Sequence, residues 1–247
     1  HRTMPRTAQI YALPYRLQEE GVIRFGFHGL SYESILDQLT TLDAVQSRMI
    51  VAHLGNGASM AAVRDGRSID TTMGFTPTGG LVMGTRSGDL DPGVLVYLLQ
   101  SGGMSPADLS SLVNKQAGLL GVSGSSSDMQ DLLRREADDP RAAEAVELFC
   151  YQARKYLGAL AAVLGGLDTL VFTGGIGEHA GPVRRRICER LDYLGIRLDD
   201  TRNNDSAPII SPDNSPVTVR VVATNEDLII ARHTARLVRE GAERVSL

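Results

Sequence analysis

Four short segments of this sequence combine small residues with polar side chains, a pattern that suits the binding of a phosphate group. Glycine lacks a Cβ atom, so its backbone N–H can approach a phosphate oxygen closely. Arg86 can hold an anion with two parallel N–H donors, and Glu226 offers the carboxylate oxygen that Mg²⁺ prefers. The segments are His53–Ser59, Gly84–Asp89, Thr173–His179 and Thr224–Asp227.

Each segment also has a purely structural interpretation. The first fits an ordinary hairpin, and Arg86 in the second could pair with Asp89 or Asp91 to order its own loop. The third has G-G-x-G spacing instead of the G-x-G-x-x-G of dinucleotide sites, and the fourth fits a helix cap. Together, however, phosphate-type loops, a loop arginine and a helix-start carboxylate are what phosphoryl transfer requires.

Two further features are a single histidine and a basic run. His28, between Phe27 and Gly29, is the candidate for a lone catalytic imidazole, although a lone histidine is more often structural. The run Arg184–Arg186, followed by Arg190, is typical of a solvated helix face.

Composition excludes several classes of function. The net charge of −4 and pI of about 5.8 provide no basic field for nucleic acid. Only Lys115 and Lys155 are lysines and neither follows a P-loop, which excludes a Walker-A site. Cys150 and Cys188 suggest neither a disulfide framework nor a metal cluster. The longest apolar stretch, Leu157–Leu164, is too short to span a membrane. With no disulfide framework, we expect a cytoplasmic protein.

The elements that must position these residues follow from hydrophobic periodicity and turn signals, and they predict a mixed α/β fold. Three consecutive antiparallel strands should lie within residues 48–72, with Asp65-Gly66 as a hairpin turn between two of them. Ser31 should cap an early helix, and 73–91 and 199–216 should be loops. The expected strands are 22–27, 48–54, 59–64, 67–72, 168–172 and 218–223. The expected helices are 92–100, 106–115, 127–136 and 141–164, one that opens at Pro182, and one from 226 to about 239.

Six motifs, in order along nearly the whole chain, resemble the acetokinase family. They are Phe25–Gly29 (FGFHG), His53–Ser59 (HLGNGAS), Asp70–Pro77 (DTTMGFTP), Met83–Asp89 (MGTRSGD), Phe172–Glu178 (FTGGIGE) and Thr224–Glu226 (TNE). The resemblance implies the ribonuclease-H-like core of the actin, Hsp70 and sugar-kinase superfamily, an α/β fold with a mixed sheet and flanking helices. It further implies Mg²⁺-dependent phosphoryl transfer between ATP and acetate, which interconverts ADP and acetyl phosphate.

The resemblance also assigns roles residue by residue. His28 and Arg86 match residues that contact the transferring phosphoryl group, Glu226 matches the Mg²⁺ carboxylate, and Phe27 and Pro77 match the pocket for the acyl methyl end. The matched nucleotide-binding residues are His53, Asn56, Gly57, Asp128, Met129, Gln130, Gly174, Gly175, Ile176, Gly177 and His179.

Three positions depart from the family pattern. Tyr32 replaces a second histidine, Met129-Gln130 replaces Phe-Arg, and His179 replaces asparagine. Because methionine keeps an apolar contact to a purine whereas the lost arginine removes a stacking surface, these changes bear on nucleotide preference more than on the reaction.

The family carries an N-terminal domain before the matched part. We therefore expect residues 1–225 to form the nucleotide-binding domain, and helix 226–247 to pack on that absent domain and expose apolar surface without it. On this interpretation the 247-residue chain alone is inactive, and the intact enzyme is a homodimer with small-molecule substrates and no nucleic-acid or membrane partner. Mn²⁺ is an alternative to Mg²⁺. Propionate or another short-chain acyl acceptor, or nucleotide binding without catalysis, remains an alternative function.

Overall fold

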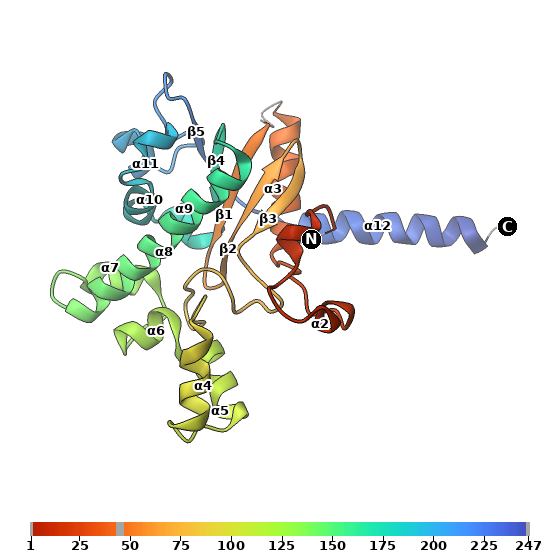
Figure 1. Cartoon of the computed structure of the whole chain (residues 1–247). Coiled ribbons are helices and arrows are strands. Elements are labelled where there is room, and N and C mark those ends of the chain that lie inside the picture. The colour runs from red at the N-terminus through yellow and green to blue at the C-terminus, as the bar shows by residue number, and fades with distance from the viewer. Residues whose placement is uncertain (1, 43–46, 246–247) are drawn as a thin grey trace.

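Five strands form one mixed sheet at the centre of the molecule (Figure 1), in the order β3-β2-β1-β4-β5. The computed structural model describes residues 2–42 and 47–245. Strands β1, β2 and β3 are antiparallel neighbours, whereas β4 runs parallel to both β1 and β5. The strands are β1 (Arg48–Leu54), β2 (Ala58–Arg64), β3 (Arg67–Thr71), β4 (Thr169–Thr173) and β5 (Thr218–Val221).

Local sequence explains the antiparallel half of the sheet. Asp65 and Gly66 both have positive φ, +50° and +74°, as the predicted two-residue hairpin turn requires. The pairing sets His53 opposite Ser59 on β2 and beside Thr173 on β4. This register places polar side chains at the end of an otherwise apolar β1.

Helices cover both faces of the sheet (Figure 1). Ile50 and Phe172 belong to the large core that contains the buried face of α8, whereas Val51 and Val171 pack with Ile35 of α3 on the opposite face. The helices are α1 (Arg6–Gln9), α2 (Tyr15–Glu19), α3 (Gly29–Thr41), α4 (Pro92–Gln100), α5 (Pro106–Ser111), the π-helix η1 (Leu112–Gln116), α6 (Gly118–Ser123), α7 (Met129–Arg135), α8 (Pro140–Leu164), α9 (Gly174–His179), α10 (Gly181–Cys188), the 3₁₀ helix η2 (Asp192–Leu194), α11 (Asp200–Asn204) and α12 (Glu226–Val245).

The predicted β1 and α4 are confirmed to the residue, and most other boundaries differ by one or two positions. The strand predicted over 22–27 was wrong, because the N–H groups of Phe25 and Gly26 both donate to the Gly74 carbonyl and pair with no strand. The helix predicted over 106–115 changes to a π-helix at Leu112. The predicted loop 199–216 contains α11 and buries Ile210 in the core.

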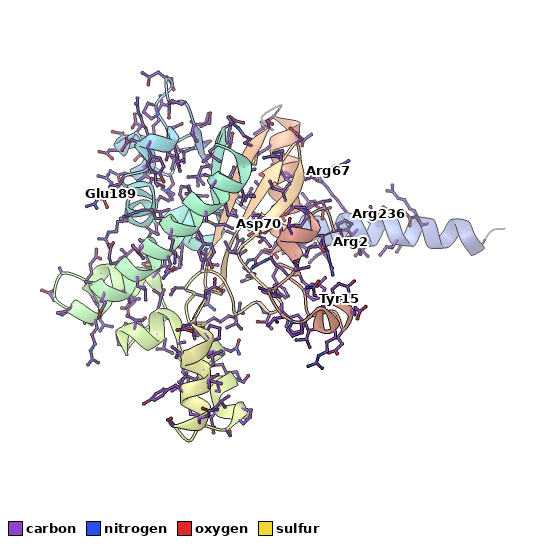
Figure 2. The ribbon with its side chains drawn as sticks, viewed as in Figure 1. Arg2, Tyr15, Arg67, Asp70, Glu189 and Arg236 are labelled. Carbon is purple, nitrogen blue, oxygen red and sulfur yellow. The ribbon has the colours of Figure 1, made fainter. Side chains whose placement is uncertain are left out.

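Helix α12 extends away from the rest of the molecule, with Arg236 on the projecting part (Figures 1 and 2). Near its start it packs on α3, where Arg232 pairs with Asp37 and His233 with Glu33. Ile229 is buried, whereas Leu237 is 62% exposed. Within the described residues, no helix combines the length and the apolar character that a membrane crossing would need.

Candidate active site

The candidate site residues gather where the parallel strands β1 and β4 end. Ligands of open α/β sheets bind in the crevice beyond the carboxyl ends of such strands. The chain leaves β1 through residues 55–57 and leaves β4 directly into α9. Gly174 starts α9 with a φ of +76°, and a Cβ there would lie 2.8 Å from the Leu54 carbonyl oxygen. Only glycine therefore allows α9 to begin this close to β1.

A pocket of about 630 Å³ lies beside this point. It brings together seven of the expected nucleotide-binding residues from three separate segments. Gly174 and Gly177 do not line it, because both are buried against the strands below α9. The pocket is lined by Gly55, Asn56, Asp128, Met129, Gln130, Leu133, Gly175, Ile176, His179, Ala180 and Pro182.

A second cluster, made of His28, His53 and Arg86, adjoins the pocket. A Cβ added at Gly57 would lie 3.2 Å from His28 Nε2 and 3.4 Å from Arg86 Nη1. A Cβ at Gly55, which lines the pocket, would lie 3.8 Å from His53 Nε2. The turn after β1 therefore connects an apolar pocket to a cluster of N–H donors.

The two histidines are held in fixed orientations. His28 adopts a left-handed φ of +62° immediately before α3, and its ring stacks on His53 with 4.2 Å between centroids. His28 Nδ1 lies 2.8 Å from Ser59 Oγ, and His53 Nδ1 lies 2.8 Å from Ser31 Oγ. The prediction of Ser31 as a helix cap was wrong, because His28 takes the cap position and Ser31 lies in the first turn of α3, where it holds His53.

The hydrogen-bond network indicates which nitrogen of His28 carries the proton. Ser59 is fully buried and its hydroxyl contacts both His28 Nδ1 and the Tyr32 hydroxyl. Every hydroxyl hydrogen finds an acceptor only if Tyr32 donates to Ser59 and Ser59 donates to Nδ1. Any other arrangement leaves one of these hydroxyl hydrogens without an acceptor among the described residues, which is unfavourable beside the buried Ser59. This network assigns the His28 proton to Nε2, the nitrogen that faces Gly57.

Both imidazoles are uncharged at neutral pH. Burial, together with the neighbouring His53 and Arg86, lowers the pKa of His28 to about 4. Burial also lowers the pKa of His53, although the carboxylates of Glu226 and Glu178 act in the opposite direction. Because the two rings are neutral N–H donors, Arg86 supplies the positive charge of the cluster.

Among the described residues, the Arg86 guanidinium contacts the Pro77 carbonyl and the Met83 sulfur and forms no ion pair with a carboxylate. The aspartates that could have paired with it are engaged elsewhere. Asp89 accepts hydrogen bonds from the Gly80 N–H at 2.7 Å and from the Tyr156 hydroxyl, and Asp91 caps α4. An unpaired guanidinium that faces a cluster of N–H donors is suited to an anionic ligand.

The backbone around Arg86 is supported by residues that sequence reasoning missed. The carbonyl of Val113, in the π-helix η1, accepts a hydrogen bond from the Ser87 N–H at 3.0 Å, and the Thr85 carbonyl accepts one from the Ala117 N–H at 3.1 Å. Gly118 has a φ of +65°, and a Cβ there would lie 2.7 Å from the Arg86 carbonyl oxygen. A glycine just after a predicted helix is a recognisable signal for such a turn, but its partner loop is not visible in the sequence.

The two residues expected at an acyl group lie in different surroundings. The Pro77 carbonyl accepts a hydrogen bond from Arg86 Nη1 at 3.3 Å, which places Pro77 beside the cluster. Phe27 is exposed and lines a separate hollow of about 420 Å³ together with Leu36 of α3 and Ala61 of β2. The described residues thus place Phe27 and Pro77 in no common pocket.

Glu226 lies half-buried at the start of α12, close enough to His53 for its charge to affect that ring. No group of three or more His, Cys, Asp or Glu side chains in the described ranges is placed to hold a metal ion by itself. Mg²⁺, however, is commonly held by one or two carboxylates together with substrate phosphates. A single carboxylate beside the donor cluster fits that mode of binding.

The basic run on α10 corrects one prediction. Arg184 is fully buried instead of solvated. Its guanidinium donates to the carbonyls of Gly177 and Glu178 at 2.8 and 2.9 Å, and also to Asn203 and Ser206. Arg184 therefore holds the carboxyl end of α9 in place through hydrogen bonds to two of its carbonyl groups.

Comparison with known proteins supplies the context for this site. The family model described as the acetokinase family matches residues 1–232. A curated acetate kinase of Rhodopseudomonas palustris is 51% identical over 246 residues, which are 98% of this chain and 61% of that protein. One from Symbiobacterium thermophilum is 47% identical and is covered to 62% of its length. The chain thus spans about three fifths of these relatives.

Solved structures agree in fold as well as in sequence. Acetate kinase from Porphyromonas gingivalis matches with a TM-score of 0.91 and 42% identity, over 96% of this chain and 61% of that one. A propionate kinase from Francisella tularensis matches with a TM-score of 0.88 and 42% identity, over 94% and 60%. The chain is thus equally identical in sequence to a structure named acetate kinase and to one named propionate kinase.

Proposed function

This chain belongs to the acetokinase family, and from that premise we propose that it is the nucleotide-binding part of an acetate kinase. The enzyme would transfer the γ-phosphoryl group of ATP to acetate, or run in reverse from acetyl phosphate and ADP. The observation that carries the proposal is the turn after β1, which joins a nucleotide-sized pocket to an unpaired arginine and two neutral histidines.

The nucleoside would occupy the pocket between α7 and α9. Met129 and Ile176 offer apolar contacts for a purine, and Gln130 offers polar ones. The phosphates would then extend along Asn56 and Gly57 towards His53. This orientation directs the terminal phosphoryl group to the point where His28 and Arg86 converge.

In phosphoryl transfer, catalysis consists mostly of positioning and neutralisation of charge. Arg86 would neutralise the negative charge on the transferring group, while the Nε2–H of His28 donates a hydrogen bond to one of its oxygens. Because His28 stays uncharged, it can donate without losing its proton to the anion. Stacking on His53 and the hydrogen bond to Ser59 keep the ring in place before the substrate arrives.

Glu226 would hold a divalent cation, Mg²⁺ or Mn²⁺, together with the nucleotide phosphates. The cation, when bound, neutralises the phosphates and so assists the transfer. Because relatives carry about two fifths of their length outside the matched part, we assign the remaining acyl-binding residues to that part. Propionate is the alternative acceptor, and a nucleotide-binding module without catalysis is the alternative for the chain alone.

We further propose that the enzyme is a homodimer that uses α4. This nine-residue helix has no buried residue, although six of its residues are aliphatic or aromatic. Val96 is 49% exposed and Tyr97 is 63% exposed. Exposure of such an apolar helix to water is unfavourable, and in a symmetric dimer the α4 of a second copy would bury it.

Formation of acyl hydroxamate from acetate, ATP and hydroxylamine tests the function. The protein expressed from its complete gene should turn over acetate, and Arg86→Ala should lower kcat by about 10²–10⁴-fold while ADP affinity changes little. Arg67→Ala, at an exposed arginine on β3, is the control and should behave as wild type. A near-normal rate in Arg86→Ala would contradict the role of Arg86, and preference for propionate would select the alternative acceptor.

A further inference from the structure

One carboxylate links two of the segments that the proposed function uses. Glu178, in the last turn of α9, accepts a hydrogen bond from the Gly174 N–H at 2.9 Å and one from Thr173 Oγ1 at 3.4 Å. The same oxygen, Oε1, accepts from the Thr224 N–H at 3.2 Å, two residues before Glu226. Glu178 thus ties the start of α9 to the segment that leads into α12, 46 residues further along the chain.

The position of Glu178 is itself fixed. Its side chain is only 16% exposed, and the Arg184 guanidinium donates to its backbone carbonyl at 2.9 Å. Within the described residues, no guanidinium or ammonium group pairs with this carboxylate, and the basic side chain in contact with it is the exposed His179, whose Nε2 lies 4.0 Å from Glu178 Oε2. Withdrawing a carboxylate from water without such a partner costs free energy, which here only its hydrogen bonds offset.

Glu178 and the proposed cation ligand Glu226 both lie near His53. The carboxylates of Glu178 and Glu226 both act on His53, so two negative charges face the same ring. Glu226 would serve as the ligand, because Oε1 of Glu178 already accepts hydrogen bonds from three donors.

We propose that Glu178 is a positioning residue that couples nucleotide binding to cation binding by holding the α9 turn and the Glu226 segment in one arrangement. The inference rests on the proposed function, since it takes the pocket as the nucleotide site and Glu226 as the cation ligand. Without the Glu178 hydrogen bonds, the α9 turn and the segment that leads into α12 would lose the side chain that joins them directly. The cation and the nucleotide would then bind more independently of each other.

Calorimetric titration of ADP into the 247-residue chain, with and without Mg²⁺, tests this coupling. In wild type we expect Mg²⁺ to raise ADP affinity by about tenfold or more. In Glu178→Ala that enhancement should fall to about twofold or less, while affinity for ADP alone changes by less than about threefold. Glu178→Gln keeps a carbonyl acceptor and should retain most of the enhancement. Glu189→Ala, at an exposed carboxylate beside α10 (Figure 2), is the matched control.

Hydrogen exchange gives a second readout that involves no ligand. The Thr224 amide should exchange faster in Glu178→Ala and as in wild type in Glu178→Gln. Undiminished Mg²⁺ enhancement in Glu178→Ala, or an equal loss in Glu178→Gln, would overturn the proposed coupling and leave the function intact. Wild-type protein that binds no ADP under either condition would instead overturn the proposed function, and this inference with it.

Discussion

Alanine at Gly174 tests whether the turn between β4 and α9 has the geometry described above. Gly174 has a φ of +76°, and an added Cβ would lie 2.8 Å from the carbonyl oxygen and 3.1 Å from the carbonyl carbon of Leu54. These are backbone atoms of β1, so they cannot move aside as a side chain would. Either β1 or the start of α9 must shift.

The expected cost follows from two contributions. The left-handed conformation disfavours alanine by about 1–2 kcal/mol, and relief of the contact with β1 adds about 1–2 kcal/mol. Gly174→Ala should therefore lower the free energy of unfolding by about 2–4 kcal/mol. For a chain of this length, that corresponds to a fall in Tm of about 5–15 °C. Urea unfolding followed by circular dichroism measures the loss.

The neighbouring glycine provides the matched control. Gly175 has no unusual φ, and a Cβ there would meet no atom within 4 Å. Gly175→Ala should leave stability within about 1 kcal/mol of wild type, but its methyl group enters the pocket and should weaken ADP binding by about tenfold. Wild-type stability in Gly174→Ala would refute the account of the turn, and unchanged ADP affinity in Gly175→Ala would refute the placement of the nucleotide.

Three further predictions concern other parts of the molecule. Because the pKa of His28 falls from 6.5 to about 4 on folding, stability should decrease as the pH falls from about 6.5 to 4. His28→Gln should flatten that dependence in urea titrations, and an unchanged slope would contradict it. Arg184→Met leaves buried carbonyl groups without their hydrogen-bond donor and should lower the free energy of unfolding by about 3–5 kcal/mol. Arg185→Met, at a half-exposed arginine, is the control and should lower it by less than about 1 kcal/mol. Val96→Glu on α4 should convert the dimer to a monomer in light scattering of the protein from its complete gene, and a persistent dimer would exclude α4 as the contact.

Much of the fold was predictable because its signals are local. The apolar run of β1, the Asp65-Gly66 turn and the capped start of α4 each specify their own structure. The missed elements depend on distant partners. Residues 22–27 look like a strand, but the Gly74 carbonyl takes the N–H groups that would form a ladder. The π-helix η1 forms where its carbonyls meet the Arg86 loop.

The candidate site shows the same division. Seven residues of the expected nucleotide set meet in one pocket. The residues after β1 and β4 meet because both strands end at the same edge of the sheet, and Asp128–Gln130 join them from the start of α7. The supporting residues carry no such signal. Arg184 belongs to a run that looks solvated, and Glu178 looks like the end of a motif. Only the fold reveals that Glu178 holds the start of α9 and that Arg184 holds its carboxyl end.

A crystal structure of the chain with Mg²⁺ and ADP is the most direct test of the central claim. The account predicts the adenine between α7 and α9 in contact with Met129 and Ile176, and the β-phosphate beside Gly57, facing His28 and Arg86. ADP bound in another hollow, such as the one lined by Phe27, or phosphates directed away from Gly57, would contradict it.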